Sequence, residues 1–98
     1  MAKTETTKFD SADYLNSAEA IAAYLDDWLE DGSPEELRHA LATVARSKGM
    51  SDLARRSGLS RPGIYKALGE DGNPSFETIR SILGAMGLRL TVEPAEAA

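Results

Sequence analysis

The sequence contains no cysteine and only one histidine among its 98 residues. The absence of cysteine excludes disulfides, thiolate metal sites and cysteine nucleophiles. His39 has no companion at ligand spacing, so we predict neither a metal site nor a cofactor. No apolar run approaches the roughly eighteen residues of a membrane span, and no signal peptide is visible. We therefore expect a cytoplasmic protein.

A catalytic constellation is also lacking. The chain has 16 Asp and Glu residues, but carboxylates on exposed helix faces lack the buried pocket that shifts a catalytic pKa. No glycine-rich loop that could hold a phosphate is present. We therefore expect that the chain is not an enzyme.

Hydrophobic periodicity predicts five helices, which occupy most of the chain. Serines at positions 17, 33, 51, 60 and 75 are the predicted N-caps. Glycines at positions 32, 49, 58 and 87 are predicted to end four of the helices, the first of which runs to Asp31. The side chains expected in the core are Ile21, Tyr24, Leu25, Trp28, Leu29, Leu37, Leu41, Val44, Ala45, Leu53, Ala54, Leu59, Ile64, Leu68, Phe76, Ile79, Ile82, Leu83 and Met86. The pattern is typical of an all-α domain.

The C-terminal part changes period. Residues 88–93 alternate apolar and polar side chains, which predicts a half-buried strand that stops at Pro94. A lone strand needs a partner for its backbone, and residues 7–9 are the only other, weak strand candidate in the chain. We therefore predict that Leu88, Leu90 and Val92 pair with a second copy across a two-fold axis. The alternative is an extended tail that packs on its own helices. We expect a disordered N-terminus at 1–8, one domain at 9–94 and a frayed tail at 95–98.

Residues 50–69 are the most informative segment, because they form a helix-turn-helix pattern of the kind found in DNA-binding proteins. Gly58 suits the left-handed turn between two short helices, and Pro62 is tolerated in the first turn of the second helix. Ile64 and Leu68 lie four residues apart and predict one buried face. The opposite face of the second helix carries Arg61, Pro62, Tyr65 and Lys66.

Charge supports DNA binding at this segment. Residues 46–66 hold six basic residues and one acid, whereas residues 1–45 have a net charge of −7 in a protein whose total is −5. Positive charge gathered on one motif of an acidic protein indicates an electrostatic site for a nucleic acid. The alternative is an exposed charged helix face.

Roles for the individual residues follow from how helix-turn-helix proteins dock. We predict that Arg61 and Lys66 read base edges and that Tyr65 stacks on a sugar or methyl group. Arg55 and Arg56 are expected to meet phosphates, since the first helix crosses the backbone. Ser60, Asn73 and Ser75 complete the predicted DNA-binding set; Asn73 and the free amides near Ser75 could hold a phosphate, although ordinary capping chemistry explains them equally well.

Three parts of the sequence resemble a known protein family. The segments that carry the resemblance are FDSADYL with AIAAYL, then MSDLARRSGLSRPGIYKAL, then GNPSFETIRSILGAMGLRL. The chain resembles the addiction-module antidote proteins, the helix-turn-helix antitoxins of the HigA-like type. The resemblance implies a five-helix, lambda-repressor-like domain that represses its own operon and neutralises a toxin encoded beside it. It also implies a small, basic toxin similar to ribosome-dependent RNases or gyrase poisons.

An acidic N-terminal half suits a basic toxin. We interpret Phe9 and Tyr14 as apolar anchors for it, and Asp26, Asp27 and Asp31 as its electrostatic contacts; a solvated acidic helix face is the alternative. Two other functions stay open. One is a stand-alone or prophage-type repressor with no toxin, and the other is an interaction module that does not use its helix-turn-helix.

Overall fold

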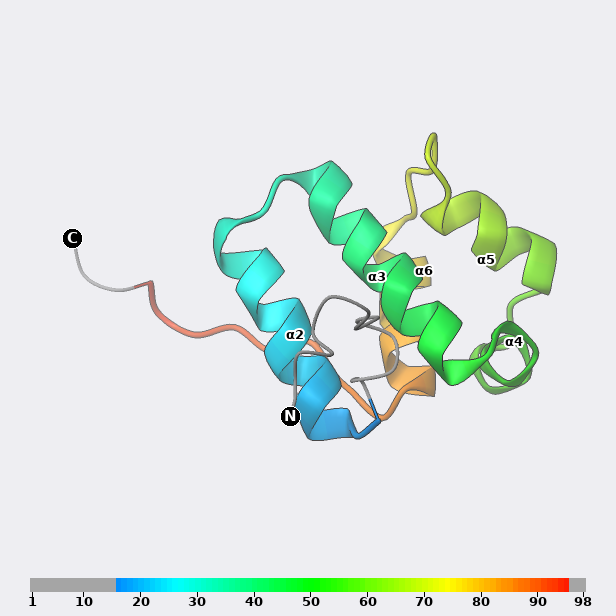
Figure 1. Cartoon of the computed structure of the whole chain (residues 1–98), viewed down its shortest axis with the longest axis horizontal. Helices are drawn as coiled ribbons and strands as arrows, with labels where there is room; N and C mark the ends of the chain where they lie inside the picture. The colour runs from blue at the N-terminus through cyan, green and yellow to red at the C-terminus, as the bar shows by residue number, and fades with distance from the viewer. Residues whose placement is uncertain (1–15, 96–98) are drawn as a thin grey trace, which may run out of the picture.

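The computed structural model describes residues 16–95, and within them the chain forms five α-helices and no strand. The all-helical prediction is thus confirmed for this part of the chain. The helices are α2 (Ala18–Asp31), α3 (Pro34–Lys48), α4 (Met50–Ser57), α5 (Arg61–Leu68) and α6 (Phe76–Ala85). Helix α3 lies between α2 on one side and α4 and α5 on the other (Figure 1), and it packs against all three. Among these helices, none is long and apolar enough to cross a membrane.

Serine caps begin four of the helices as predicted. The hydroxyl of Ser17 accepts from the amide of Ala20, and those of Ser60 and Ser75 accept from the third residue of α5 and α6. Ser33 forms a complete capping box, in which its own amide donates to the carboxylate of Glu36. Each cap satisfies an amide that has no partner inside its helix, so the sequence alone determines where these helices begin.

The predicted cap at Ser51 is wrong. Helix α4 begins at Met50, and its N-cap is Gly49, which has φ 93° and also ends α3. One glycine with a left-handed φ turns the chain directly from α3 into α4. Ser51 consequently lies in the first turn of α4, and its side chain makes no capping bond.

The end of α6 shows why the chain leaves the bundle where it does. Gly87 has φ 82°, its amide donates to the carbonyl of Gly84, and the amide of Leu88 donates to the carbonyl of Leu83. These two bonds form a Schellman motif, and Leu88 packs against the core as such motifs favour. The glycine predicted to end this helix therefore does so, two residues after the last helical position.

The core lies where α3, α4, α5 and α6 meet, with α2 closing one side. Its fully buried side chains include Ile21, Val44, Leu53, Ile64 and Ile82. Tyr24 and Trp28, which were also expected in the core, are half-buried against it, with their rings in edge contact at 6.4 Å. Most of the inward residues predicted after α2 are buried, which confirms that part of the prediction: Leu41, Val44, Ala45, Leu53, Ile64, Leu68, Ile82, Leu83 and Met86. Leu37, Ala54, Leu59 and Ile79 are half-buried.

Two core predictions are wrong. Phe76 is 70% exposed and Leu29 is 58% exposed. Phe76 is the first residue of α6, and because helical side chains lean toward the N-terminus it extends past the end of the helix rather than into the bundle. Leu29 lies at the edge of the apolar stripe of α2 and lines an open groove beside the C-terminal segment.

Residues 88–93 form no strand in the described chain, contrary to the prediction. They run as an extended segment beside α2 (Figure 1), and within residues 16–95 no other strand lies next to them. A strand needs a hydrogen-bonded neighbour, and residues 16–95 of one copy supply none to this segment. Leu88 is anchored, whereas Leu90 and Val92 are exposed at 39% and 97%. The predicted disorder at 1–8, the anchors Phe9 and Tyr14, and most of the frayed tail lie outside the described residues.

The substitution Gly58→Ala tests whether the turn between α4 and α5 depends on a left-handed backbone. Gly58 has φ 80°, and a Cβ added there would meet no atom within 4 Å, so alanine would add backbone strain without a clash. Left-handed backbone at alanine costs about 1–2 kcal/mol, and for a domain of this size each kcal/mol lowers the melting temperature by roughly 4–8 °C. We expect Gly58→Ala to show this loss in thermal unfolding followed by circular dichroism.

Gly84 provides the matched control. It lies inside α6, its added Cβ also meets nothing within 4 Å, and its φ is not left-handed. Alanine there should stabilise the helix by about 0.5–1 kcal/mol. A Gly58→Ala protein that melted at or above the wild-type temperature would show that the turn does not depend on the left-handed conformation.

Candidate nucleic-acid interface

Helices α4 and α5, joined by the turn at residues 58–60, form the segment predicted to bind DNA; we call it the helix pair. The two helices pack against each other, α4 also packs on α6, and both contact α3. Ile64 and Leu68 fix α5 from its buried face. All the residues predicted to contact DNA are exposed: Arg55, Arg56, Ser60, Arg61, Pro62, Tyr65, Lys66, Asn73 and Ser75.

The exposed face of α5 brings two predicted contact residues together. The guanidinium carbon of Arg61 lies 6.0 Å from the centre of the Tyr65 ring, within the range of a cation–π contact. Tyr65 is 55% exposed, so the pair lies on the surface and does not belong to the core. A cation resting on an aromatic ring in this way loses less freedom when it meets a ligand than a free arginine does.

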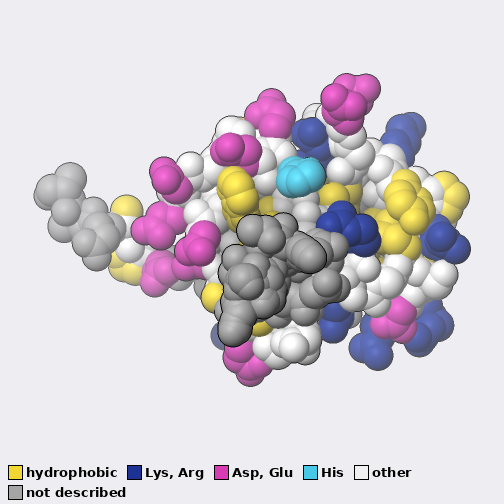
Figure 2. Space-filling view, in the orientation of Figure 1, with side chains coloured by type: hydrophobic (Ala, Val, Ile, Leu, Met, Phe, Trp, Pro, Cys, Tyr) yellow, Lys and Arg dark blue, Asp and Glu magenta, His cyan; other side chains and the backbone are white. Residues whose placement is uncertain are grey.

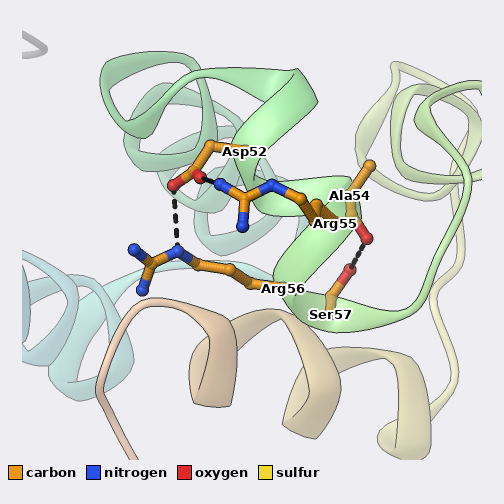
Figure 3. A network of polar contacts seen from close by, with 5 residues as sticks. All are labelled: Asp52, Ala54, Arg55, Arg56 and Ser57. Carbon is orange, nitrogen blue, oxygen red and sulfur yellow. Dashed lines mark hydrogen bonds and ion pairs between the residues drawn. The ribbon is translucent and has the colours of Figure 1, made fainter.

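On α4 the two arginines predicted to meet phosphates share one carboxylate. Asp52 forms ion pairs with Arg55 and with Arg56, the second at 3.1 Å between Nε and Oδ2. Both arginine side chains turn toward Asp52 (Figure 3). The sequence analysis missed this arrangement, although residues at i+3 and i+4 on a helix are regular neighbours.

The serines of the predicted set serve as caps. The hydroxyl oxygens of Ser60 and Ser75 accept helix amides, and Ser75 also donates to the hydroxyl of Thr78. The loop between α5 and α6, which contains Asn73, is held to α3 by Arg38, whose guanidinium donates to the carbonyl of Glu70 at 2.6 Å. The Arg38 bond holds the loop beside the helix pair. The bonds of Ser60 and Ser75 are ordinary helix caps, and for Ser75 capping is the alternative that the sequence left open.

Acidic residues gather on the opposite side of the molecule. Asp26, Asp27, Glu30 and Asp31 on α2 are all exposed, and we call these four residues the acidic face. In Figure 2 acidic side chains cluster over α2 and the turn into α3, and a smaller acidic group lies over the loop after α5, whereas basic side chains cluster toward α4 and α5. The uneven charge along the sequence thus becomes a separation between two sides of the fold. Within residues 16–95 no group of three or more His, Asp or Glu side chains is arranged to hold a metal ion.

Comparison with known proteins identifies the family. The family model described as "probable addiction module antidote protein" matches residues 5–94. The chain belongs to this antidote family. The match extends across all five described helices, so membership does not rest on the helix pair alone. It supports an antitoxin role and suggests a regulatory protein rather than an enzyme.

One similar protein adds to the comparison. An uncharacterized protein of Haemophilus influenzae is 42% identical over 91 residues, which cover 92% of this chain and 94% of that protein. The two chains are therefore similar over nearly their full lengths. No solved structure matches the chain.

Proposed function

We propose that this antidote-family protein is the antitoxin of a toxin–antitoxin pair, which binds and neutralises a small basic toxin and represses its own operon by binding operator DNA. Its domain is of the lambda-repressor-like, HigA-like helix-turn-helix type. The observation that carries the proposal is the separation of charge between the helix pair and the acidic face. A protein with two such sides can bind two ligands of opposite charge at once.

DNA binding rests on the helix pair. Its exposed cations lie on two short helices joined by a glycine turn, and the second helix presents Arg61, Tyr65 and Lys66 to solvent. In helix-turn-helix proteins that helix enters the major groove, where arginine can donate two bonds to one guanine. The first helix then lies against the backbone, so Arg55 and Arg56 contact phosphates.

Toxin binding uses the acidic face, together with the apolar anchors proposed at Phe9 and Tyr14. Long-range attraction between the acidic face and a basic toxin speeds their encounter. Apolar anchors then determine how long the complex lasts. Because the acidic face lies on α2 and the helix pair is formed by α4 and α5, the two ligands do not compete for one surface.

We further propose that the protein is a homodimer in which residues 88–93 of two copies pair as antiparallel strands. Within residues 16–95 the last backbone hydrogen bond is the one from Leu88 to Leu83, and the amides that follow have no backbone partner among these residues. Leu90 and Val92 are exposed apolar side chains on this extended segment. A two-fold dimer also matches DNA half-sites that lie about one helical turn apart.

DNA recognition is tested by two arginines with different predicted roles. Arg61→Ala should cost roughly 1–3 kcal/mol of binding to the promoter and relax the preference at one position of each half-site. Arg55→Ala should weaken binding to all sequences alike and reduce the salt slope by about 1, because it removes a phosphate contact. Gel-shift titration on the promoter and on a scrambled duplex measures both effects.

Arg80→Ala is the control, since Arg80 is exposed on α6 and outside the helix pair. It should bind both duplexes as the wild type does. Wild-type affinity of Arg61→Ala for the promoter would remove Arg61 from the base-reading set. If the adjacent gene encoded no toxin but the promoter were bound, the protein would be a stand-alone repressor.

A further inference from the structure

Residues 46–66 hold six basic residues and a single acidic residue, Asp52. Its carboxylate is 37% exposed and pairs with Arg55 and Arg56, whose side chains are 71% and 60% exposed (Figure 3). It also lines a shallow hollow between α4 and the end of α6, together with Lys48 and Arg56. The carboxylate thus lies among cations that the protein otherwise displays to solvent.

Stability does not account for this arrangement. Ion pairs between exposed side chains contribute little to folding, because water and salt screen them and the side chains must be held in place. An acid in the first turn of a helix is favourable, and α4 has no side-chain N-cap, so Asp52 does assist the helix. An acid without ion-pair partners would stabilise the start of the helix equally well. Helix stability therefore does not explain why Asp52 also pairs with two arginines.

We propose that Asp52 limits the sequence-independent affinity of the protein for DNA by competing with phosphates for Arg55 and Arg56. This inference rests on the proposed function. When a phosphate approaches α4, each arginine either exchanges the carboxylate for the phosphate or brings the carboxylate close to it. In both cases Asp52 opposes binding, and it does so equally for every sequence, since phosphates carry no sequence information.

Such a limit shortens the time that a repressor spends on non-specific DNA. Non-specific sites greatly outnumber operators, and binding to them depends mainly on phosphate contacts. Two unopposed arginines on α4 would raise affinity for all DNA without improving the preference for the operator. Asp52 therefore lowers the phosphate-dependent part of the affinity and leaves the sequence preference to contacts made by α5, where the predicted base-reading residues lie.

The test is the salt dependence of binding by Asp52→Asn, which removes the charge and keeps the size of the side chain. The probes are the duplex upstream of the gene and a scrambled duplex of equal length, with fluorescence anisotropy measured over a series of salt concentrations. Removing one opposing charge should raise the affinity for both duplexes by about three- to tenfold near 0.1 M salt and steepen the salt slope by about 1. The ratio of the two affinities should stay unchanged.

Two variants separate competition from other effects. Asp52→Glu keeps the charge and should bind like the wild type, and Glu19→Gln removes an equal charge from the first turn of α2 and should leave the salt slope unchanged. A purely structural role would lower the melting temperature of Asp52→Asn without steepening the slope. Suppose that the wild type binds DNA and that Asp52→Asn binds it with the same affinity and salt slope, or more weakly. The proposal that Asp52 competes with phosphates would then be wrong. If the wild type bound neither duplex, the DNA-binding proposal would fail and this inference with it.

Discussion

Leu90→Pro should convert the protein from a dimer to a monomer and lower its affinity for the promoter by about 10²–10⁴-fold. The proline removes a backbone donor from the proposed strand pair. Once the copies separate, each half-site is bound singly, and the gain from linking two binding events is lost. Sedimentation velocity at micromolar concentration measures the first effect, and titration of the promoter measures the second.

The same substitution should leave the fold of one copy intact. The amide of Leu90 makes no backbone hydrogen bond within residues 16–95, and its side chain is 39% exposed. Ala95→Pro is the control, because it adds a proline to the same segment after the predicted strand ends. A wild-type protein that sedimented as a monomer, or a Leu90→Pro protein that stayed dimeric, would contradict the strand-paired dimer.

What could be predicted from the sequence was local chemistry. Ser33 and Glu36 form their capping box three residues apart, and Gly58 has the left-handed φ that its turn requires. Such features depend on a few neighbouring residues, so a sequence displays them directly. The buried faces of α3 to α6 also followed from the 3.6-residue period, because it states which side chains share a face.

The errors occurred where the answer depends on distant parts of the chain. Leu29 and Phe76 fit the apolar period, but whether another element covers them is a property of the whole fold. Residues 88–93 have the alternation of a strand, but no other strand lies beside them in the described part of the chain, residues 16–95. Of the candidate site, the sequence predicted which side chains are exposed on the helix pair. The sequence analysis did not predict that Asp52 pairs with both arginines of α4, although they follow it at i+3 and i+4, where ion pairs form on a helix.

The acidic face leads to the second large effect. Changing Asp26, Asp27 and Asp31 to lysine should slow association with the toxin encoded beside the gene by about 10- to 10³-fold at low salt, since electrostatic steering toward a basic partner is reversed. All three residues are exposed on α2, so the substitutions should not disturb the core. Phe9→Ala should instead leave association nearly unchanged and speed dissociation, because an apolar anchor acts after encounter. Surface-plasmon kinetics with the purified toxin resolves the two rates.

The decisive comparison is a second triple variant with the same change in net charge. Glu70, Asp71 and Glu77 are also exposed, but they lie in the loop after α5 and at the start of α6. Lysine at these three positions should slow association far less than lysine on the acidic face, because steering acts over about 10 Å at moderate salt and depends on where the charge lies. Equal slowing by both triples would mean that net charge alone attracts the toxin. A different result would be no change in the kinetics with either triple variant or with Phe9→Ala, but a change on deletion of residues 88–98. The toxin would then bind at the C-terminal segment. In that case dimer formation and toxin binding would compete for the same residues.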